Sequence, residues 1–242
     1  LRAEGYQVAF GVASTAEERL AVMDDLAVRK VEGMLFFNCE KELDSCYSRY
    51  PIPLLHFDGM DGEIRMGLEA GQLLAMRHLI QVHGHRRIGC FSSLRSYNVA
   101  KVAGYRKAFR EAGLKHSMEW EIDAFQNPRW MEETLEMIRK HRLTAMVCNN
   151  DDYAANLIGM LMRNGIRVPD DCAVIGYDGD CYAPYLAVPL TTVVQPVSLL
   201  AQRMAERILE KIRGRILVKL EPEELQPYLS VGRSCGCEPC GE

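Results

Sequence analysis

The stretch Gly165–Gly179, GIRVPDDCAVIGYDG, carries the pattern that decides the fold. Gly165 closes a helix, because glycine readily adopts the left-handed backbone conformation found just past a helix end. VPDD then turns the chain, and CAVIGY is an apolar run typical of a buried strand. Asp178 follows where that strand stops. Ligands of open α/β sheets bind at the carboxyl ends of the strands, so the stretch predicts both a parallel sheet and a binding residue.

Strand-like and helical segments alternate from Tyr6 onward. Successive parallel strands are joined by crossover helices, so this alternation predicts an α/β fold with parallel sheets flanked by helices. Ser14 and Glu17 have the spacing of a capping box, and Gly113 and Gly165 are placed to end helices. The strand-like segments are 6–13, 33–37, 53–58, 86–93, 119–125, 144–150, 172–179, 190–196 and 225–234. The helical segments are 17–30, 67–80, 99–113, 130–141, 153–165 and 197–213.

A chain of 242 residues has room for two such lobes. We expect an N-terminal lobe of residues 1–85 plus 196–214, with a sheet that is incomplete at its start. A C-terminal lobe of residues 86–195 plus 215–237 and a tail of residues 238–242 complete the division. Three crossings near His85, Gln195 and Leu217 would then form a hinge between the lobes.

Composition limits the functions that the chain can have. The 29 lysine and arginine residues against 33 aspartate and glutamate residues give a net charge of −4, and the basic side chains are scattered. A segment of this kind is a poor binder of the nucleic-acid backbone. No apolar run approaches the roughly 18 residues that span a bilayer, and the first residues do not have the pattern of a signal peptide. We therefore expect a cytoplasmic protein.

The nine cysteines also favour a reducing compartment. An odd number spread along the chain is not typical of a secreted disulfide framework. Cys39, Cys90, Cys148 and Cys172 lie in or beside predicted buried strands, where a thiol packs as a small apolar group.

The C-terminal sequence SCGCEPCGE places Cys235, Cys237 and Cys240 within six residues. Thiolates at this spacing are suitable ligands for a soft metal ion. However, three cysteines at a chain end without a histidine nearby in the sequence do not complete a site. We therefore expect a plain or frayed tail, with no metal and no cofactor, and a zinc site at the three cysteines remains the alternative.

Four segments of the chain are informative when taken together: HLIQVHGHRRIGCFSS (78–93), VAGYRKAFREAGL (102–114), VCNNDDYAANLIGMLMRNGIRVPDDCAVIGYDG (147–179) and PLTTVVQP (189–196). In this order they resemble the effector-binding domain of the LacI/GalR family of bacterial transcription regulators. The resemblance covers nearly the whole chain. It implies a type I periplasmic-binding-protein-like fold, with a small polar effector between two lobes and assembly into a homodimer. It also implies a DNA-binding helix-turn-helix domain, which we expect to precede this segment in a longer protein.

The resemblance assigns candidate ligand-binding residues one position at a time. Asp178 matches an acidic position that accepts hydrogen bonds from the effector, although a turn aspartate could instead bond to its own loop. Asn150, at the end of the preceding strand, has a donor and an acceptor suited to a polyol. Asp151 beside it is expected to cap the following helix.

Four further positions complete the candidate site. Lys101 stands where the family usually has an arginine, and it is either an effector contact or a solvated helix residue. Arg95 and Tyr97 match cleft positions in the loop before that helix. Phe125 matches an aromatic residue that covers the effector ring, unless it is part of the core, and Trp130 lies close enough to replace it. With these residues we expect the effector to be a sugar or a sugar derivative.

The sequence disfavours an enzyme. It has no G-x-G-x-x-G after a strand, no Walker-type phosphate loop and no G-x-S-x-G nucleophile elbow. Asp151 and Asp152 are adjacent at a helix start, so their side chains point in different directions. Two other interpretations remain: a sugar-binding protein of a transport system, and a sensor module of another signalling protein.

We expect the homodimer to form through apolar helix surfaces. Segments 20–33 and 157–165 have more apolar residues than one sheet face needs. Met23, Leu161 and Met162 are the candidates for this additional contact surface.

Overall fold

The computed structural model describes residues 1–37, 49–57, 63–92, 98–125, 127–214 and 222–238. The chain forms two compact units. Unit 1 comprises Leu1–Arg65 and Val197–Leu225, and unit 2 comprises Met66–Pro196 and Gln226–Glu242. The chain therefore passes between the units three times.

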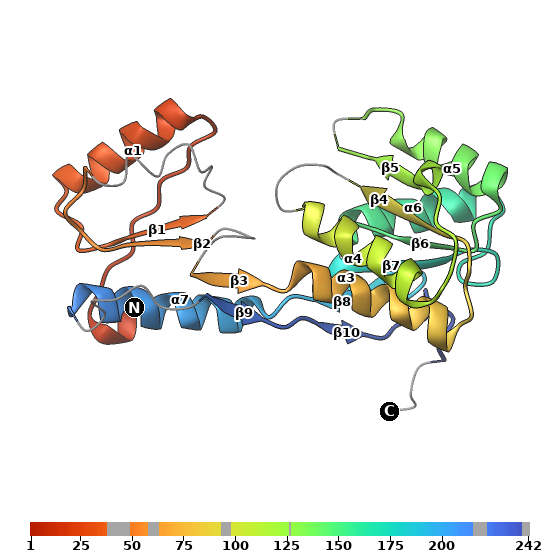
Figure 1. The fold of residues 1–242 in the computed structure, drawn as a ribbon. Coiled ribbons are helices and arrows are strands. Elements are labelled where there is room, and N and C mark those ends of the chain that lie inside the picture. The colour runs from red at the N-terminus through yellow and green to blue at the C-terminus, as the bar shows by residue number, and fades with distance from the viewer. Residues whose placement is uncertain (38–48, 58–62, 93–97, 126, 215–221, 239–242) are drawn as a thin grey trace. The chain divides into compact units, whose positions relative to one another are not determined.

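Unit 2 is built on a six-stranded sheet with the strand order β10-β8-β7-β6-β4-β5 (Figure 1). All neighbouring strands are parallel except β10, which pairs antiparallel with β8. After β4 the chain adds β5 at one edge of the sheet. It then returns to the other side of β4 and adds β6, β7 and β8 in turn, so the direction of strand addition reverses between β4 and β6. The strands are β4 (Ile88–Ser92), β5 (Glu121–Asp123), β6 (Ala145–Val147), β7 (Ala173–Asp178), β8 (Thr191–Val194) and β10 (Tyr228–Ser230).

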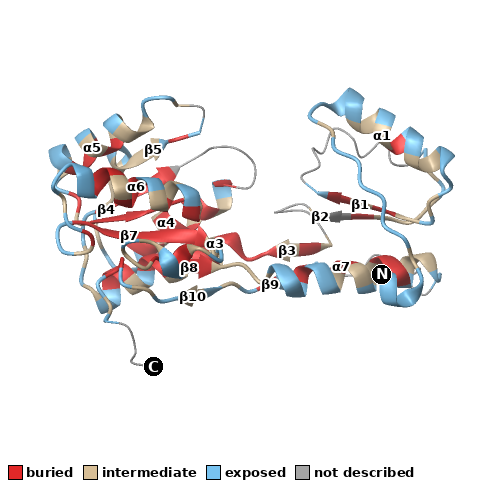
Figure 2. Ribbon diagram, turned by 180° about the vertical axis from the view of Figure 1, so that it is seen from behind, coloured by how far each residue is buried: buried red, intermediate tan, exposed pale blue. Residues whose placement is uncertain are grey.

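Helices cover both faces of this sheet. Figure 1 shows α3 and α4 on one face and α5 and α6 on the other. Their inward sides and the central strands are buried, and their outward sides are exposed (Figure 2). The helices are α3 (Leu68–Arg77), α4 (Asn98–Glu111), α5 (Trp130–His141) and α6 (Asp151–Arg163). The π-helical turn η3 (His78–Val82) continues α3, and the short 3₁₀ helices η4 (Met118–Trp120) and η5 (Ala183–Tyr185) lie in loops.

Unit 1 contains the parallel strands β1 (Met34–Phe37) and β2 (Leu54–Phe57). Helix α1 (Ala16–Val28) packs on them through Met23, which contacts Met34 and Phe36 in a small core. The remaining elements are η1 (Arg2–Glu4), α7 (Val197–Ile212) and the strands β3 (Ile64–Met66) and β9 (Glu223–Leu225). β3 and β9 pair as a separate two-stranded sheet, and α7 packs on β1 and β2.

The fold class agrees with the sequence, since both units combine parallel strands with flanking helices. The first division between the units lies at Arg65, about twenty residues before the position expected at His85. The reason is α3, which packs along α4 and belongs with it in unit 2. The other passages follow Pro196 and Leu225, where we expected Gln195 and Leu217.

Two local predictions near the start of the chain are wrong. Residues 6–13 do not form a strand, and Phe10 and Val12 within them are each 91% exposed. The apolar pattern alone is insufficient, because a strand needs a neighbouring strand to hydrogen-bond to, and these residues pair with none in the described ranges. The capping box is one residue later than predicted: Thr15 Oγ1 accepts from the Glu18 amide, and the Glu18 carboxylate accepts from the Thr15 amide.

Of the three residues predicted to form the dimer contact, only one is exposed. Met23 and Leu161 are buried in the cores of their own units, with 1% and 0% of their surface exposed. Met162 is 48% exposed. The amphipathic pattern could not separate these cases, because it does not show how much of each helix its own sheet covers.

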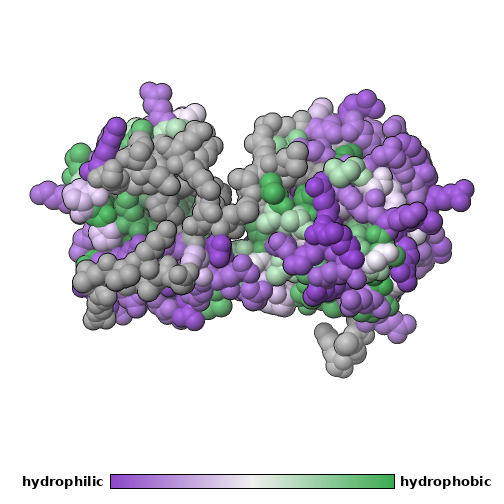
Figure 3. Space-filling model, viewed as in Figure 1, coloured by the Kyte–Doolittle hydropathy of each residue, from purple (hydrophilic) through white to green (hydrophobic). Residues whose placement is uncertain are grey.

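The outer surface of unit 2 is mainly hydrophilic on the face seen in Figure 3. In the part of the chain that the structure describes, no helix combines the length and the apolar character that crossing a bilayer requires.

The contact between α3 and α4 gives a test of unit 2. A Cβ atom at Gly104 would collide with the backbone carbonyl of Glu69, which cannot move aside as a side chain can. We expect Gly104→Ala to lower the free energy of unfolding by about 1–3 kcal/mol. Both tryptophans of the chain, Trp120 and Trp130, lie in unit 2, so urea unfolding followed by tryptophan fluorescence reports on this unit.

Gly159→Ala in α6 is the matched control. Its Cβ would meet only the flexible end of Arg163, and alanine favours a helix over glycine by up to about 1 kcal/mol. We expect this variant to be as stable as the parent chain or more so. Equal unfolding midpoints for Gly104→Ala and Gly159→Ala would contradict the close packing of α3 on α4.

Candidate functional site

The carboxyl ends of β6 and β7 form one edge of the unit 2 sheet. Val147 of β6 pairs with Ile175 of β7, and Asn150 and Asp178 each lie three residues beyond that pair. The two polar residues therefore come at the same level of neighbouring strands. The strand order reverses between β4 and β6, so Asn150 lies next to this position and Asp178 lies one strand away. Such a position is the usual ligand site of an open α/β sheet.

Asp178 ends β7 in an unusual backbone conformation. Its φ is +115°, a value that few residues other than glycine adopt, and Gly179 follows with φ +79°. Gln195, just after β8, donates from Nε2 to Asp178 Oδ1 at 2.5 Å, and its amide donates to the Asp178 carbonyl at 3.2 Å. Within the described ranges no residue is bonded to the second carboxylate oxygen, Oδ2. Asp178 is thus held firmly and retains one oxygen that can accept from a ligand.

Several neighbouring groups shift the pKa of the Asp178 carboxyl group. Burial raises the pKa of its carboxyl group, whereas the Lys101 ammonium and the hydrogen bond from Gln195 lower it. The nearby carboxylates Asp180 and Asp152 raise it further. The net effect is a raised pKa, so Asp178 takes up a proton at a higher pH than an exposed aspartate does.

Asn150, and not Asp151, caps α6. The Asn150 side chain accepts from the Tyr153 amide at 2.9 Å, which makes it the N-cap of the helix. The prediction that Asp151 has this role is wrong, because α6 begins at Asp151 itself, which makes the residue before it the cap. The cap occupies Asn150 Oδ1, and the Nδ2 donor has no partner elsewhere in the described structure.

Asp151 is fully buried and holds the turn that follows β7. Its Oδ2 accepts from the amides of Gly179 at 3.0 Å and Asp180 at 2.7 Å, and its Oδ1 accepts from Thr192 Oγ1 at 2.6 Å. Gly176 makes room for the carboxylate, since a Cβ atom there would collide with Asp151 Oδ1. Burial raises the pKa of Asp151, and the bonds from Thr192 and Asp180 oppose the shift. Asp151 is therefore a structural residue that fixes the backbone just after Asp178.

Lys101 is neither a solvated helix residue nor an open surface charge. Only 4% of it is exposed. Its Nζ donates to the Asn149 carbonyl at 2.6 Å and lies 3.6 Å from the centre of the Tyr177 ring. Burial lowers the pKa of Lys101 to about 8, although the carboxylates of Asp178 and Asp151 raise it. The ammonium group is thus buried near the carboxyl ends of the strands, where it balances part of the negative charge of Asp178 and Asp151.

The other predicted residues lie in different surroundings. Phe125 follows β5 and is 38% exposed, so it is not a core residue, and its amide donates to Asp123 Oδ1 at 2.9 Å. Trp130 packs edge-on against Phe91, with ring centres 5.3 Å apart, and belongs to the core of unit 2. Arg95 and Tyr97 lie outside the described residues.

Sequence reasoning missed Asp151 and Gln195 as parts of this edge. One signal pointed to Asp151: a glycine inside a buried strand, here Gly176, often marks the close approach of another group. The interaction with Gln195 had no local signal, because the two residues become neighbours only when β8 pairs with β7.

A different part of unit 2 has the residues for a metal ion. His78, His83, Cys235 and Cys237 are the one group of this kind in the described structure, with ligand atoms within 4.8 Å of one another. Burial raises the pKa of the Cys235 thiol, but hydrogen bonds from its neighbours, with His78 the first of them, outweigh this effect and lower it. In contrast, burial raises the pKa of Cys172 to about 12. Cys240 lies outside the described residues.

Comparison with known proteins supports this description. Residues 76–235 match the family model described as a periplasmic binding protein-like domain. The HTH-type transcriptional repressor PurR of Photobacterium profundum is 34% identical over 202 residues, which are 78% of this chain and 60% of that protein. The chain thus spans less than two thirds of the length of this relative.

Solved structures share the fold. A sugar-binding transcriptional regulator of the LacI family from Escherichia coli, complexed with phosphate, aligns with a TM-score of 0.82 at 22% identity, over 96% of this chain and 87% of that one. The lac repressor dimer bound to operator and the anti-inducer ONPF aligns with a TM-score of 0.83 at 23% identity, over 97% and 73%. The resemblance to LacI/GalR effector-binding domains is confirmed, and the chain belongs to the family of periplasmic binding protein-like domains.

Proposed function

We propose that this chain is the effector-sensing and dimerisation domain of a bacterial transcription regulator. It binds a small polar molecule, a sugar or a sugar derivative, at the carboxyl edge of the unit 2 sheet. The observation that carries this proposal is the state of Asp178. Its carboxylate is fixed by Gln195 through one oxygen, and the other oxygen has no partner in the described part of the chain.

The residues at this edge suit a molecule with several hydroxyl groups. Asp178 Oδ2 accepts a hydrogen bond and Asn150 Nδ2 donates one. One hydroxyl of the ligand can therefore donate to Asp178 while its neighbour accepts from Asn150. Both side chains are held by bonds within unit 2, which reduces the entropy lost on binding. The partly exposed ring of Phe125 offers an apolar face for a sugar ring. Arg95 and Tyr97 remain candidates for further contacts on the strength of the family resemblance.

The regulatory role rests on the family and on its named members. The PurR relative is a transcriptional repressor, one similar structure is a sugar-binding regulator, and another is a repressor dimer bound to its operator. This segment carries a net charge of −4, so we assign DNA contacts to another part of the regulator. We infer that the domain is not an enzyme and that it acts in the cytoplasm.

A thermal-shift screen tests the ligand class. The probes are sugars, sugar phosphates, nucleobases and amino acids. A ligand at 100 times its dissociation constant stabilises the folded domain by about 2.7 kcal/mol, which is readily measured. We expect a sugar or a sugar derivative to give the largest shift. A response to nucleobases alone would retain the sensing role but contradict the sugar assignment.

Asp178→Asn tests the binding edge directly. Asparagine tolerates positive φ at least as well as aspartate, so the turn should keep its shape. The charge-assisted acceptor is lost, which should cost about 1.5–3 kcal/mol of binding, or roughly 10- to 150-fold in affinity. Isothermal titration with the ligand from the screen measures this change. Asp170→Asn, an exposed aspartate in the turn before β7, is the control and should bind as the parent does. Unchanged affinity for Asp178→Asn would make Asp178 a structural turn residue only.

Lys101→Met should change how binding depends on pH. Binding weakens as the pH falls through the pKa of Asp178, because the protonated carboxyl group loses its charge-assisted bond. The Lys101 ammonium lowers that pKa, so its removal should raise the pKa and move the acid limit of binding to higher pH. Titrations across the acid range measure the midpoint. Lys107→Met is the control, since Lys107 pairs with Glu69 at 2.8 Å and does not contact Asp178. Equal midpoints for Lys101→Met and the parent would contradict this coupling.

The proposed homodimer gives a separate prediction. Met162 remains exposed on α6, so we expect Met162→Lys to weaken association by placing a charge in an apolar contact. Sedimentation equilibrium should show a dimer for the parent chain and a larger monomer fraction for the variant. Lys140→Met, a substitution on the exposed side of α5, is the control. A parent chain that stays monomeric in the presence of its ligand would contradict the dimer.

A further inference from the structure

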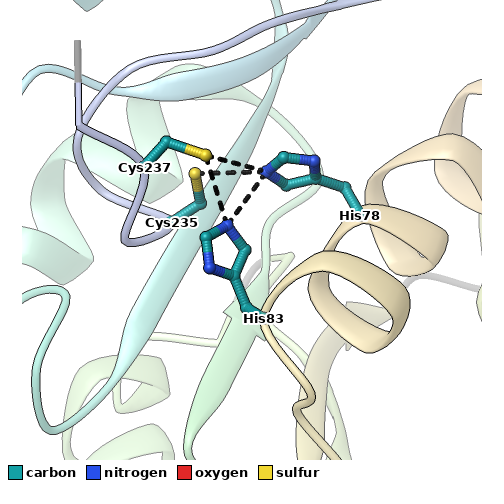
Figure 4. A group of neighbouring side chains, drawn as sticks. All are labelled: His78, His83, Cys235 and Cys237. Carbon is teal, nitrogen blue, oxygen red and sulfur yellow. Dashed lines mark hydrogen bonds between the residues drawn. The ribbon is translucent and has the colours of Figure 1, made fainter.

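Four side chains far apart in the sequence converge in unit 2. His78 is the first residue of the turn η3, His83 follows that turn, and Cys235 and Cys237 come from the segment after β10. Figure 4 shows the two imidazole rings and the two sulfur atoms pointing toward one another. The Nε2 and Sγ atoms lie within 4.8 Å of one another, although His78 and Cys235 are 157 residues apart in the chain.

Four of the six distances between the ligand atoms match the edges of a tetrahedron around a metal ion. With zinc–nitrogen distances near 2.05 Å and zinc–sulfur distances near 2.3 Å, a tetrahedral site places two nitrogens about 3.4 Å apart and a nitrogen and a sulfur about 3.6 Å apart. The Nε2 atoms of His78 and His83 are 3.2 Å apart. His78 Nε2 lies 3.3 Å from Cys235 Sγ and 3.6 Å from Cys237 Sγ, and His83 Nε2 lies 3.3 Å from Cys237 Sγ.

Hydrogen bonds alone do not account for this arrangement. His78 Nε2 has three polar neighbours: one nitrogen and two sulfur atoms. An imidazole nitrogen carries either one proton or one lone pair, directed in the plane of the ring, so it makes one good hydrogen bond. A single metal ion bound between the four atoms explains more simply why they all lie close together.

The backbone is shaped to bring the four ligands together. In an α-helix, residues five apart lie about 140° from each other around the axis. The π-helical turn η3, whose hydrogen bonds link residues five apart, places His78 and His83 on one side. Between the two cysteines, Gly236 has φ +102°, a conformation suited to glycine, and a Cβ there would lie 3.3 Å from His83 Nδ1.

The segment before the cysteines is itself fixed to the sheet. Ser234 is buried, and its hydroxyl donates to the Val174 carbonyl at 2.5 Å and accepts from the Thr191 amide at 2.9 Å. The Thr191 hydroxyl lies 3.0 Å from Cys235 Sγ, where it can donate to a thiolate. A hydrogen-bonded neighbour of this kind orients a metal ligand.

We propose that His78, His83, Cys235 and Cys237 bind one Zn²⁺ ion in a closed structural site. Two thiolates and two neutral imidazoles form a common donor set of structural zinc sites, and the two thiolate charges balance the ion. Binding releases the thiol protons to the solvent. All four positions are filled by protein, so the ion has no open position for a substrate. Its role is to fasten the C-terminal segment to the end of α3.

Metal analysis of the whole 242-residue chain tests the proposal. The protein is purified without a histidine tag, under reducing conditions, and dialysed against buffer without metal. We expect one zinc per chain by elemental analysis and by native mass spectrometry. His83→Gln and Cys237→Ser should each lose the zinc. Both residues are partly exposed, so these variants should fold, whereas the buried Cys235 is less suited to substitution.

Three matched variants serve as controls. Cys181→Ser removes an exposed cysteine of unit 2, His141→Gln removes a histidine of α5, and Cys240→Ser removes the remaining cysteine of the tail. Each should retain one zinc per chain. Loss of zinc in Cys240→Ser together with its retention in His83→Gln would overturn the assigned ligand set.

Cobalt(II) gives an independent measurement of the coordination. The chain freed of zinc with a chelator should bind one Co²⁺ and show the strong visible bands of tetrahedral cobalt, with thiolate charge-transfer bands in the near ultraviolet. His83→Gln and Cys237→Ser should lose this spectrum. The proposal is overturned by the weak spectrum of six-coordinate cobalt, by a parent chain that holds no zinc, or by a mass two hydrogens lighter that reveals a Cys235–Cys237 disulfide.

Discussion

The candidate binding edge depends on one buried carboxylate, that of Asp151. Through Thr192 and the amides of Gly179 and Asp180, it joins the start of α6 to β8 and to the turn after β7. A buried carboxylate is costly unless its oxygens are bonded, and here both oxygens are. The turn that it fixes begins with the strained backbone of Asp178. Without this support, neither the positive φ of that residue nor the direction of its side chain would be well defined.

The fold was predictable because it rests on periodic patterns. Alternating apolar strands and amphipathic helices identified the sheet of unit 2, and the bounds predicted for α5, 130–141, are those of the structure. The same patterns failed where the outcome depends on a distant partner. Residues 6–13 have the pattern of a strand but pair with none in the described structure. Likewise, α3 belongs to unit 2 because it packs on α4, a contact that no local pattern reveals.

The candidate site was predicted in part, for similar reasons. A strand end is a local feature, so Asn150 and Asp178 could be placed at the edge, but their partners could not. A shift of one residue moved the helix cap from Asp151 to Asn150, because either side chain can cap a helix. Lys101 was open between an effector contact and a solvated residue, and its burial beside Tyr177 rules out only the second. The sequence identified Cys235 and Cys237 as possible metal ligands, but their histidine partners were missed because they lie in another part of the sequence.

The central claim is that Asp178 binds the ligand while Asp151 holds the edge in place. A crystal structure of the chain with the ligand from the screen tests it most directly. We predict the ligand at the carboxyl ends of β6 and β7, within hydrogen-bond distance of Asp178 Oδ2 and Asn150 Nδ2. Asp151 should keep its bonds to Thr192 and the turn. A ligand bound elsewhere, or one contacted by Asp151 in place of Asp178, would contradict the account.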